Sequence, residues 1–491
     1  MPTLPVTFRR KTLALGVACA LTACSTLPHY SVPEAAVPAR YAAPAGPVQA
    51  APGWAVATPG DTHARGDWWT LFNAPELNRL EDQLPVSNQT IKKAVAQLQQ
   101  ARAMIDYQHA GFLPTITAGA AQSRTRLSQN VEGHSLAGQT VPDYSLGLAA
   151  SWEPDLFGRV RDAVVNAHDN AQASEADLEA VHLSMSTDLA SDYFALRALD
   201  IQKKLLDDSV TAYAAALAIL KQQLADGAID ASATATAQAE TQLEDTRSQA
   251  SDIEVQRAEV VHAIATLIGV PASSFSLAPR VESIPVPQIP AGLPSQLLER
   301  RPDIAAAERR VAAANAQIGE AKAAFYPDLT LSASAGLEST FFAPWLTAPS
   351  LFWSIGPQLV GTLFDGGKRD AALKGATAQY DGSVADYRQT VLVALQQVED
   401  NLSALDTLAS EAQSQRRATA AAERSLELTQ NRYQAGAVGY LDVVTVQTIA
   451  LANQRTEAQI QARRLDASVQ LLKALGGGWD RTALSSSQNQ D

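Results

Sequence analysis

The chain contains two copies of one repeat, and this duplication constrains its fold more than any other feature. The most similar stretches are residues 156–163 (LFGRVRDA) and residues 363–371 (LFDGGKRDA). Three further matches keep the same order at nearly the same sequence offset: Pro114 with Pro327, Gly227 with Gly436, and residues 267–269 with residues 475–477. Self-similarity at a fixed spacing is the signature of a repeated structural unit. It argues against an enzyme built around a single cleft.

Each repeat is predicted to pass from a strand into a very long helix. An alternating apolar run precedes each of the two similar stretches, and about 65 residues without proline follow it. The expected long helices are residues 159–225 and 368–434, and the expected shorter ones are residues 87–111, 232–268, 303–324 and 440–475, with Ser87 or Asn88 as the cap of the first. At about 1.5 Å per residue, two short helices placed end to end match one long helix. Apolar side chains every three or four residues predict antiparallel coiled-coil packing.

Four segments alternate between apolar and small polar residues with the period of a strand. In the first repeat, Ile116, Ala118 and Ala120 share one face. The expected segments are residues 112–120, 144–152, 329–335 and 352–363. Their length and alternation are typical of tilted membrane strands, and a pair of soluble hairpins is the alternative. Beyond the N-terminus, no apolar run reaches the roughly 18 residues that a membrane helix needs.

Composition and the N-terminus narrow the possible locations and partners. The 38 Lys and Arg residues against 51 Asp and Glu residues give a net charge of -13, which argues against nucleic acid as a partner. Both cysteines, Cys19 and Cys24, lie in a stretch that reads as a secretion signal, with Arg9, Arg10 and Lys11 before an apolar core. Residues 21–24 (LTAC) resemble a bacterial lipobox, which predicts a covalent lipid on Cys24; an ordinary signal peptide is the alternative.

The segments outside the repeats are rich in proline. Residues 26–65 are therefore expected to be too broken for regular structure, and the linker between the repeats, residues 270–302, is expected to contain neither helix nor sheet interior. The predicted organisation is a signal peptide (1–23), a lipidated tether and equatorial segment (24–85), a first repeat (86–269), a linker (270–302), a second repeat (303–478) and a disordered tail (479–491).

The whole chain resembles the TolC-like outer-membrane efflux proteins, and within them the lipidated OprM/NodT-like outer-membrane factors of RND multidrug pumps. The resemblance rests on the lipobox, the repeated strand-to-helix passage, residues 300–304 (RRPDI), residues 431–433 (NRY) and residues 473–479 (KALGGGW). It implies an α+β membrane protein that forms a homotrimer, in which three sets of four strands close one 12-stranded β-barrel continuous with a helical periplasmic tunnel. Four amphipathic strands alone cannot close a barrel, so oligomerisation also follows from the need to pair every backbone group in lipid.

The same resemblance implies passive export of small molecules, drugs and toxic compounds among them, across the periplasm and the bacterial outer membrane. The implied partners are an inner-membrane RND transporter, a periplasmic adaptor and outer-membrane lipid. Ser25 after the predicted lipidated cysteine agrees with outer-membrane sorting. A type I protein-secretion duct and a periplasmic coiled-coil lipoprotein without a channel are the alternatives.

Candidate functional residues lie at the turns between long and short helices. Glycine permits the chain to reverse there, and small neighbours allow close packing, so Gly227, Ala228, Gly436 and Ala437 are the expected contacts with the adaptor. By their family positions, Tyr433 and Asp442 are expected to close the tunnel at rest, with Asp226 and Asp230 as weaker candidates. Thr445 and Ala233 stand where aspartates are frequent in the family, and solvated helix-end charges are the alternative reading.

The sequence contains no recognisable catalytic chemistry. Residues 361–368 look like a phosphate-binding loop, but the lysine is one residue late and Arg369 replaces the required Ser or Thr. The seven histidines are scattered without metal-ligand spacing. We therefore expect neither an enzyme nor a metal site, and no cofactor beyond the lipid on Cys24.

Overall fold

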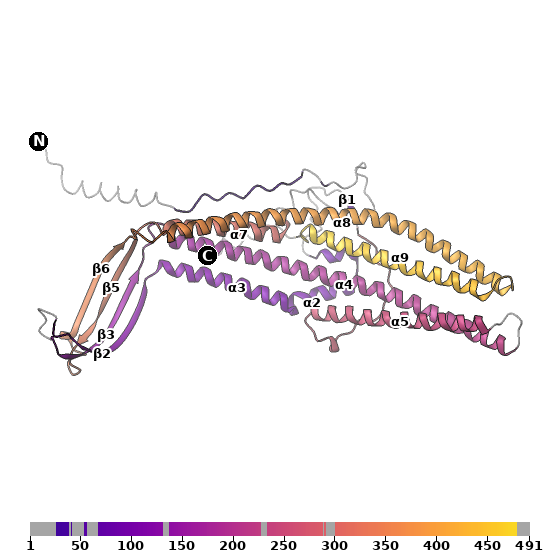
Figure 1. The fold of residues 1–491 in the computed structure, drawn as a ribbon, viewed down its shortest axis with the longest axis horizontal. Coiled ribbons are helices and arrows are strands. Elements are labelled where there is room, and N and C mark those ends of the chain that lie inside the picture. Colours follow the sequence, from indigo (N-terminus) through magenta and orange to yellow (C-terminus); the bar gives the residue numbers. More distant parts are fainter. Residues whose placement is uncertain are drawn as a thin grey trace. The chain divides into compact units, whose positions relative to one another are not determined.

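The computed structural model describes residues 26–38, 41, 54–55, 67–130, 137–226, 233–287, 289–290 and 300–478. The chain forms two compact units. Unit 1 comprises Met1–Glu34, Gln97–Ser174 and Ala307–Tyr387, and unit 2 comprises Ala35–Ala96, Glu175–Ala306 and Arg388–Asp491. Each unit draws on both sequence repeats, as the colours of Figure 1 show.

The helices repeat in length as well as in sequence (Figure 1). The long helices α4 (Arg159–Ala225) and α8 (Lys368–Gln434) both contain 67 residues, and the returning helices α5 (Ala233–Leu267) and α9 (Tyr440–Ala474) both contain 35. The shorter α3 (Gln89–His109) and α7 (Pro302–Ala323) contain 21 and 22 residues. The long helices contain no proline, so every residue in them has an N–H to donate to the helical hydrogen bonds. The six helices predicted for the repeats are thus confirmed to within two residues at every end.

None of the helices in the described ranges combines the length and the apolarity that crossing a membrane requires.

In unit 2, the end of α5 meets the start of α3, as the predicted end-to-end arrangement requires. Asn88 makes this junction, because its Nδ2 donates to the carbonyl of Leu267 (2.7 Å) and its Oδ1 accepts the N–H groups of Thr90 (2.8 Å) and Ile91 (3.0 Å). Asn88 is therefore the cap of α3. Ser87 ends the preceding helix α2 (Pro75–Ser87) and donates to the carbonyl of Ile268 at 2.6 Å.

The second repeat builds the equivalent junction, also in unit 2, from different side chains. Arg301 precedes α7 and donates from Nη1 to the carbonyl of Ala474 at the end of α9 (3.1 Å). Both α5 and α9 end in the same glycine turn, with φ +69 at Gly269 and +93 at Gly476. The sequence similarity alone places Gly269 opposite Gly477. The shared turn geometry corrects this match by one residue.

These two glycines have no room for a side chain. A Cβ built on Gly269 would lie 2.3 Å from the carbonyl oxygen of Ser87, and one built on Gly476 would lie 2.0 Å from that of Arg300. Backbone atoms cannot move aside as a flexible side chain can. The close approach of two helix ends is therefore what requires glycine at both positions.

Unit 1 contains one antiparallel sheet with the strand order β2-β3-β5-β6. The strands are β2 (Thr115–Arg126), β3 (Thr140–Trp152), β5 (Asp328–Ser339) and β6 (Leu351–Val360). The pairing of β3 with β5 joins the two repeats, so β2 and β6 form the edges of the sheet within one chain. β6 ends at Val360 and not at the expected residue 363. The chain turns there, with positive φ at Gly366 and Gly367, before α8 begins.

The proline-rich segments take part in one small sheet that was not expected. Strand β1 (Trp54–Ala55) pairs in parallel with β4 (Ile289–Pro290) in unit 2. Each strand has only two residues, and Pro290 ends its strand, where a missing N–H costs little. The expectation that residues 26–65 contain no regular structure was therefore wrong at Trp54 and Ala55. In the linker, β4 is an edge strand, which the expectation allowed, but the short 3-10 helix η4 (Ala272–Ser274) contradicts the expected lack of helix.

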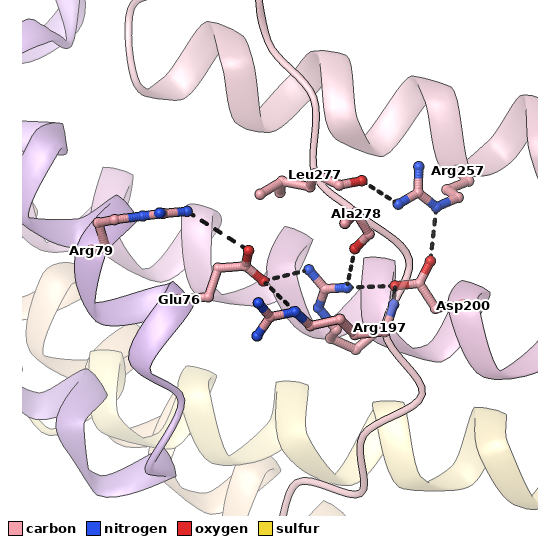
Figure 2. A network of polar contacts seen from close by, with 8 residues as sticks. Glu76, Arg79, Arg197, Asp200, Arg257, Leu277 and Ala278 are labelled. Carbon is pink, nitrogen blue, oxygen red and sulfur yellow. Dashed lines mark hydrogen bonds and ion pairs between the residues drawn. The ribbon is translucent and has the colours of Figure 1, made fainter.

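A buried ion-pair network fixes the linker to the helices of unit 2 (Figure 2). Arg197 of α4 is 2% exposed and lies between Glu76 of α2 (2.8 Å) and Asp200 (2.5 Å). Its guanidinium also donates to the carbonyl of Ala278 in the linker. Arg257 of α5 bonds to Asp200 from the other side (2.8 Å). Nη2 of Arg257 donates to the carbonyl of Leu277, also in the linker (2.5 Å). The linker is thus held to α4 and α5 by charged hydrogen bonds.

Candidate functional site

The sheet of unit 1 has one apolar and one polar face. Residues directly opposite in an antiparallel register point to the same face, which gives the composition of each face. The apolar face carries Ile116, Ala118, Ala120, Leu146, Leu148, Ala150, Leu331, Ala333, Ala335, Leu337, Leu351, Trp353 and Ile355, among others. The polar face carries Thr115, Thr117, Gly119, Ser145, Gly147, Ser151, Ser332, Ser334, Ser354 and Gln358, among others. The alternation predicted from the sequence is therefore confirmed across all four strands.

Large side chains on the apolar face are exposed in the single chain. Trp353 is 73% exposed, Ile355 74% and Leu359 67%. Contiguous exposed apolar surface of this kind marks a contact with lipid or with another protein. The strands contain 10 to 13 residues, and a tilted membrane strand needs about 9 to 11.

Aromatic side chains lie at both ends of the apolar face. At the loop end, Tyr144 packs edge-on against Phe342 (5.4 Å between ring centroids) and lies 5.9 Å from Trp345. At the end near the helices, the indole Nε1 of Trp152 donates to the carbonyl of Phe112 at 2.9 Å. Rings with one apolar and one polar side favour the boundary between lipid and water. The sheet thus has an apolar band between two aromatic borders.

An aspartate organises each passage from strand to long helix. In the first repeat, the carboxylate of Asp155 accepts the N–H groups of Val160 (3.2 Å) and Arg161 (2.8 Å) at the start of α4. In the second, the carboxylate of Asp365 accepts the N–H of Gly367 (2.9 Å) and binds Nε of Arg369 (2.6 Å). The Arg369 bond lowers the pKa of Asp365. Both aspartates therefore act as caps at the starts of the two long helices.

The predicted lipidation site, Cys24, lies outside the described residues, and the described chain begins at Thr26. The Thr26 hydroxyl is 2.9 Å from the carbonyl oxygen of Phe157 and 3.0 Å from Oδ2 of Asp162, both in unit 1. Nδ2 of Asn315 on α7 donates to the carbonyl of Pro28 (2.9 Å). Asp162 is buried, which raises its pKa, and the Thr26 hydrogen bond opposes this shift. The residues that follow Cys24 are therefore bound where the sheet passes into α4.

The turn between α8 and α9 has the geometry that its glycine predicts. Gly436 has φ +71, its N–H donates to the carbonyl of Tyr433 (2.9 Å), and the N–H of Ala437 donates to that of Arg432 (2.9 Å). This pair of bonds is a Schellman turn, which requires the left-handed conformation that glycine adopts easily. A Cβ at Gly436 would have no atom within 4 Å. Gly227 and Ala228, which the sequence places at the other turn, lie outside the described residues.

Tyr433 is half-buried beside this turn and contacts Tyr440, with ring centroids 5.9 Å apart at 61°. Both rings belong to an apolar cluster of unit 2. Its buried members are Tyr213, Leu217, Leu220, Ala239, Leu243, Tyr440 and Val443. Burial is the main cause that raises the pKa of Tyr440 to about 12, and nearby Tyr213 and Tyr433 add to the shift. Sequence reasoning did not single out Tyr440, although its position as the first residue of α9, after a glycine, was a usable signal.

The two described acidic candidates are exposed and bonded within their own chain segments. Oδ2 of Asp442 accepts the N–H of Gly439 at 3.1 Å, which caps α9. The carboxylate of Asp226 accepts Nε2 of Gln222 one turn before it (3.0 and 3.1 Å). These hydrogen bonds do not join the two carboxylates to each other, and Asp230 lies outside the described residues.

Thr445 and Ala233, the two positions that depart from the family pattern, both lie in the returning helices. The hydroxyl of Thr445 donates to the carbonyl of Leu441 in its own helix (2.8 Å), and exposed Ala233 begins α5. Neither residue adds an ionic contact at these turns.

Comparison with known proteins identifies the family. The sequence profile described as outer membrane efflux protein matches residues 80–270 and 293–477. The pyoverdine export outer membrane protein OpmQ of Pseudomonas aeruginosa is 34% identical over 85% of this chain and 89% of its own length. The solvent efflux pump outer membrane protein SrpC of Pseudomonas putida is 32% identical over 96% of this chain and 98% of its own.

A solved structure shares the fold. The structure of the outer-membrane channel OprN superposes with a TM-score of 0.83 at 27% identity, covering 93% of this chain and all of that one. The duplicated helices, the four-stranded sheet and the two matched sequence blocks agree with one another. The chain belongs to the outer membrane efflux protein family.

Proposed function

We propose that this protein is the outer-membrane channel of a tripartite efflux pump. In this proposal small molecules enter from an inner-membrane RND transporter through a periplasmic adaptor and leave passively through the channel. The observation that carries the proposal is the four-stranded sheet of unit 1, with its exposed apolar face, its polar face and its two open edges. An apolar face suits lipid, and a polar face suits a water-filled pore.

The open edges require further copies of the chain. Within lipid, an unpaired strand edge leaves backbone N–H and C=O groups without partners. In the single chain, β3 of the first repeat already pairs with β5 of the second. Because β6 is the counterpart of β3 and β2 that of β5, the same pairing between β6 and β2 of a neighbouring chain would close the sheet. Three chains supply the twelve strands that the family resemblance implies.

The duplication also predicts the register between chains. Trp152 lies opposite Leu331 in the β3–β5 pair. In the alignment of the two repeats, Leu359 on β6 is the counterpart of Trp152, and Ala118 on β2 is the counterpart of Leu331. The same pairing between chains therefore places Leu359 of one subunit opposite Ala118 of the next. Exposed side chains near this edge support the match. The rings of Phe157 and Tyr326 stack within the chain, with centroids 4.7 Å apart. Their counterparts in the other repeat, Phe364 and Leu113, are 89% and 63% exposed in the single chain, and the same register would bring them together between neighbouring subunits.

Disulfide formation between neighbouring subunits tests this proposal. Directly opposite residues have Cα atoms about 4.5 to 5.5 Å apart, which suits a disulfide. We expect the double variant Ala118→Cys/Leu359→Cys to form a covalent trimer when purified membranes are oxidised. The control Ala118→Cys/Val360→Cys places the second thiol on the opposite face and should stay uncrosslinked. Crosslinking in the control alone, or in neither variant, would refute the register.

A passive channel need not recognise the compounds that pass through it. OpmQ is named for pyoverdine export and SrpC for solvent efflux, so relatives with this fold serve unlike small molecules. We infer that the channel itself catalyses no reaction and that the pump selects the cargo. Deleting the gene that encodes this chain should make its host more sensitive to small toxic compounds. Secretion of proteins should be unaffected. Loss of a secreted protein instead would favour a type I secretion duct.

The helix turns are the proposed periplasmic end of the channel. Gly227, Ala228, Gly436 and Ala437 would contact the adaptor, and the open space around Gly436 supports an accessible surface there. Tyr433 and Asp442, with Asp226 and Asp230 as weaker candidates, would close the tunnel at rest. Three symmetry-related Asp442 carboxylates about 8 Å apart would repel by roughly 2 kcal/mol per pair at an effective dielectric near 20.

Single-channel recording tests the proposed gate. We expect Tyr433→Phe/Asp442→Ala to increase conductance in planar bilayers, because it removes the phenol hydroxyl and the carboxylate. Thr445→Ala is the matched control, since the Thr445 hydroxyl is bonded within its own helix. Wild-type conductance in the double variant would place the closure elsewhere.

A further inference from the structure

Strand β2 ends in two arginines on the apolar face of the sheet. Arg124 and Arg126 follow Ile116, Ala118 and Ala120 at intervals of two, so the period of the strand places all five on one face. Their register partners on β3 are Pro142 and Thr140. Both arginines are exposed.

Among the described residues of the sheet, no carboxylate shares a face with these two guanidinium groups. The acidic residues nearest in register are Asp143, opposite Ser123, and Glu338, opposite Ser145, and both lie on the polar face. Among the described residues, neither Arg124 nor Arg126 forms an ion pair. The loop that follows contributes one acidic residue by sequence, Glu132, which lies outside the described residues.

The neighbouring edge strand would not supply a carboxylate either. The sequence from residue 339 to residue 364, which includes β6 and its preceding loop, contains no charged residue. In the proposed register, Arg124 lies opposite Trp353 of the adjacent subunit and Arg126 opposite Leu351. Closing the sheet therefore leaves both positive charges available on the outer face.

The surroundings are layered in the order of a lipid monolayer. Along this face the apolar side chains give way to Tyr144, opposite Gln122, and then to the two arginines. Phe342 and Trp345 pack on Tyr144. Phe341 and Phe342, in the loop between β5 and β6, are 71% and 69% exposed. Acyl chains, the interfacial region and charged headgroups meet these three layers in turn.

We propose that Arg124 and Arg126 form a binding site for the phosphate groups of a phosphorylated glycolipid in the outer leaflet of the membrane. The inference rests on the proposed outer-membrane placement, which puts this loop end of the sheet outside the cell. A guanidinium binds phosphate through two parallel N–H bonds, so two arginines at adjacent positions on one face suit a diphosphorylated headgroup. The trimer would carry three such sites, one at each junction between subunits.

Lipid retention measured by native mass spectrometry tests the site. Trimers in phosphatidylcholine nanodiscs are titrated with diphosphorylated lipid A or with its dephosphorylated form. The variants are Arg124→Gln/Arg126→Gln, the charge-matched control Arg417→Gln/Arg424→Gln on α8, and Glu132→Gln. We expect roughly thirtyfold weaker binding of diphosphorylated lipid A in the first variant, because it loses two guanidinium groups that would bind phosphate. The control variant should bind like the wild type.

Three outcomes would overturn the site: equal binding by the Arg124→Gln/Arg126→Gln variant, equal binding of the dephosphorylated lipid by the wild type, or binding that is lost only in Glu132→Gln. Conductance of the same preparations in planar bilayers is recorded separately. Preparations that bind the lipid but conduct no ions would contradict the proposed channel and not the lipid site. Preparations that conduct normally while the arginine variant keeps the lipid would contradict the site alone.

Discussion

Glu81 makes the stability of unit 2 depend on pH in a direction opposite to that of an ordinary salt-bridged acid. Its side chain lies in α2 and is 2% exposed, and neither carboxylate oxygen has a hydrogen bond of standard geometry among the described residues. Burial is the main cause that raises its pKa from 4.5 to about 8. The Ser186 hydroxyl opposes this shift, and the charge of Asp82 adds to it. At neutral pH the group is therefore protonated in the folded chain and ionised in the unfolded chain.

The sign and the size of the effect follow from this difference in proton binding. Between pH 4.5 and about 8 the folded state holds one proton more than the unfolded state, so stability falls as the pH rises. Below pH 4.5 the full contribution is present, and above the folded-state pKa it is lost. Each pKa unit corresponds to about 1.4 kcal/mol, which makes the total loss about 5 kcal/mol.

Glu81→Gln tests this reasoning because the amide keeps the shape and cannot ionise. Urea unfolding of the helices, followed by far-UV circular dichroism, is compared for both proteins from about pH 5 to pH 9. The variant should be markedly more stable than the wild type at the alkaline end, and the difference should shrink toward pH 5. Glu259→Gln, an exposed site on α5, is the control. A difference that stays constant across this range would refute a buried, neutral Glu81.

Other perturbations should affect other parts of the chain. Arg197→Met should destabilise unit 2 by about 3 to 5 kcal/mol in the same urea assay, because it leaves the buried Asp200 and Glu76 with fewer partners; a loss below 1 kcal/mol would mean that the network is unimportant. Gly476→Ala should prevent assembly of stable trimers on a semi-denaturing gel, because its Cβ would lie 2.0 Å from a backbone oxygen. Gly436→Ala has room for its Cβ and should lower the free energy of unfolding by only about 1 to 2 kcal/mol, through strain in the left-handed backbone conformation. Equal effects would contradict the close approach at Gly476. Thr26→Val should speed hydrogen exchange in residues 26–38, measured by mass spectrometry, while the exposed-site control Val32→Ala should not; unchanged exchange would mean that Thr26 does not hold this segment.

The helices and the strand faces could be predicted because their signals are local. The absence of proline between Arg159 and Ala225, and the glycines just beyond the helix ends, determine where helices can run and where they must stop. The alternation around Leu146 and Leu148 fixes a face for each strand whatever its neighbour is. A duplicated sequence then tests each prediction twice, since the counterpart helices have equal lengths.

The remaining features depend on which distant segments meet. Nothing near Arg197 in the sequence indicates that Glu76 and the carbonyl of Ala278 will surround it, so a buried arginine looks like any surface charge on a helix. The docking of Thr26 on Asp162 joins residues 136 positions apart. The gate residues are limited in the same way, because a closure on a three-fold axis depends on contacts between chains that periodicity within one chain does not encode.

The equal lengths of α4 and α8, and of α5 and α9, restrict how a protein of this kind can change in evolution. Removing a single residue from one helix would shorten that helix by about 1.5 Å and rotate the residues beyond the deletion by about 100°. Asn88 or Arg301 would then be separated from the carbonyl group to which it donates. A loss of seven residues is close to two full turns, so the same helix face would still pack against the neighbouring helices. Viable insertions and deletions should therefore come in multiples of seven and occur in both halves of the gene, so length changes in one repeat should be matched by equal changes in the other.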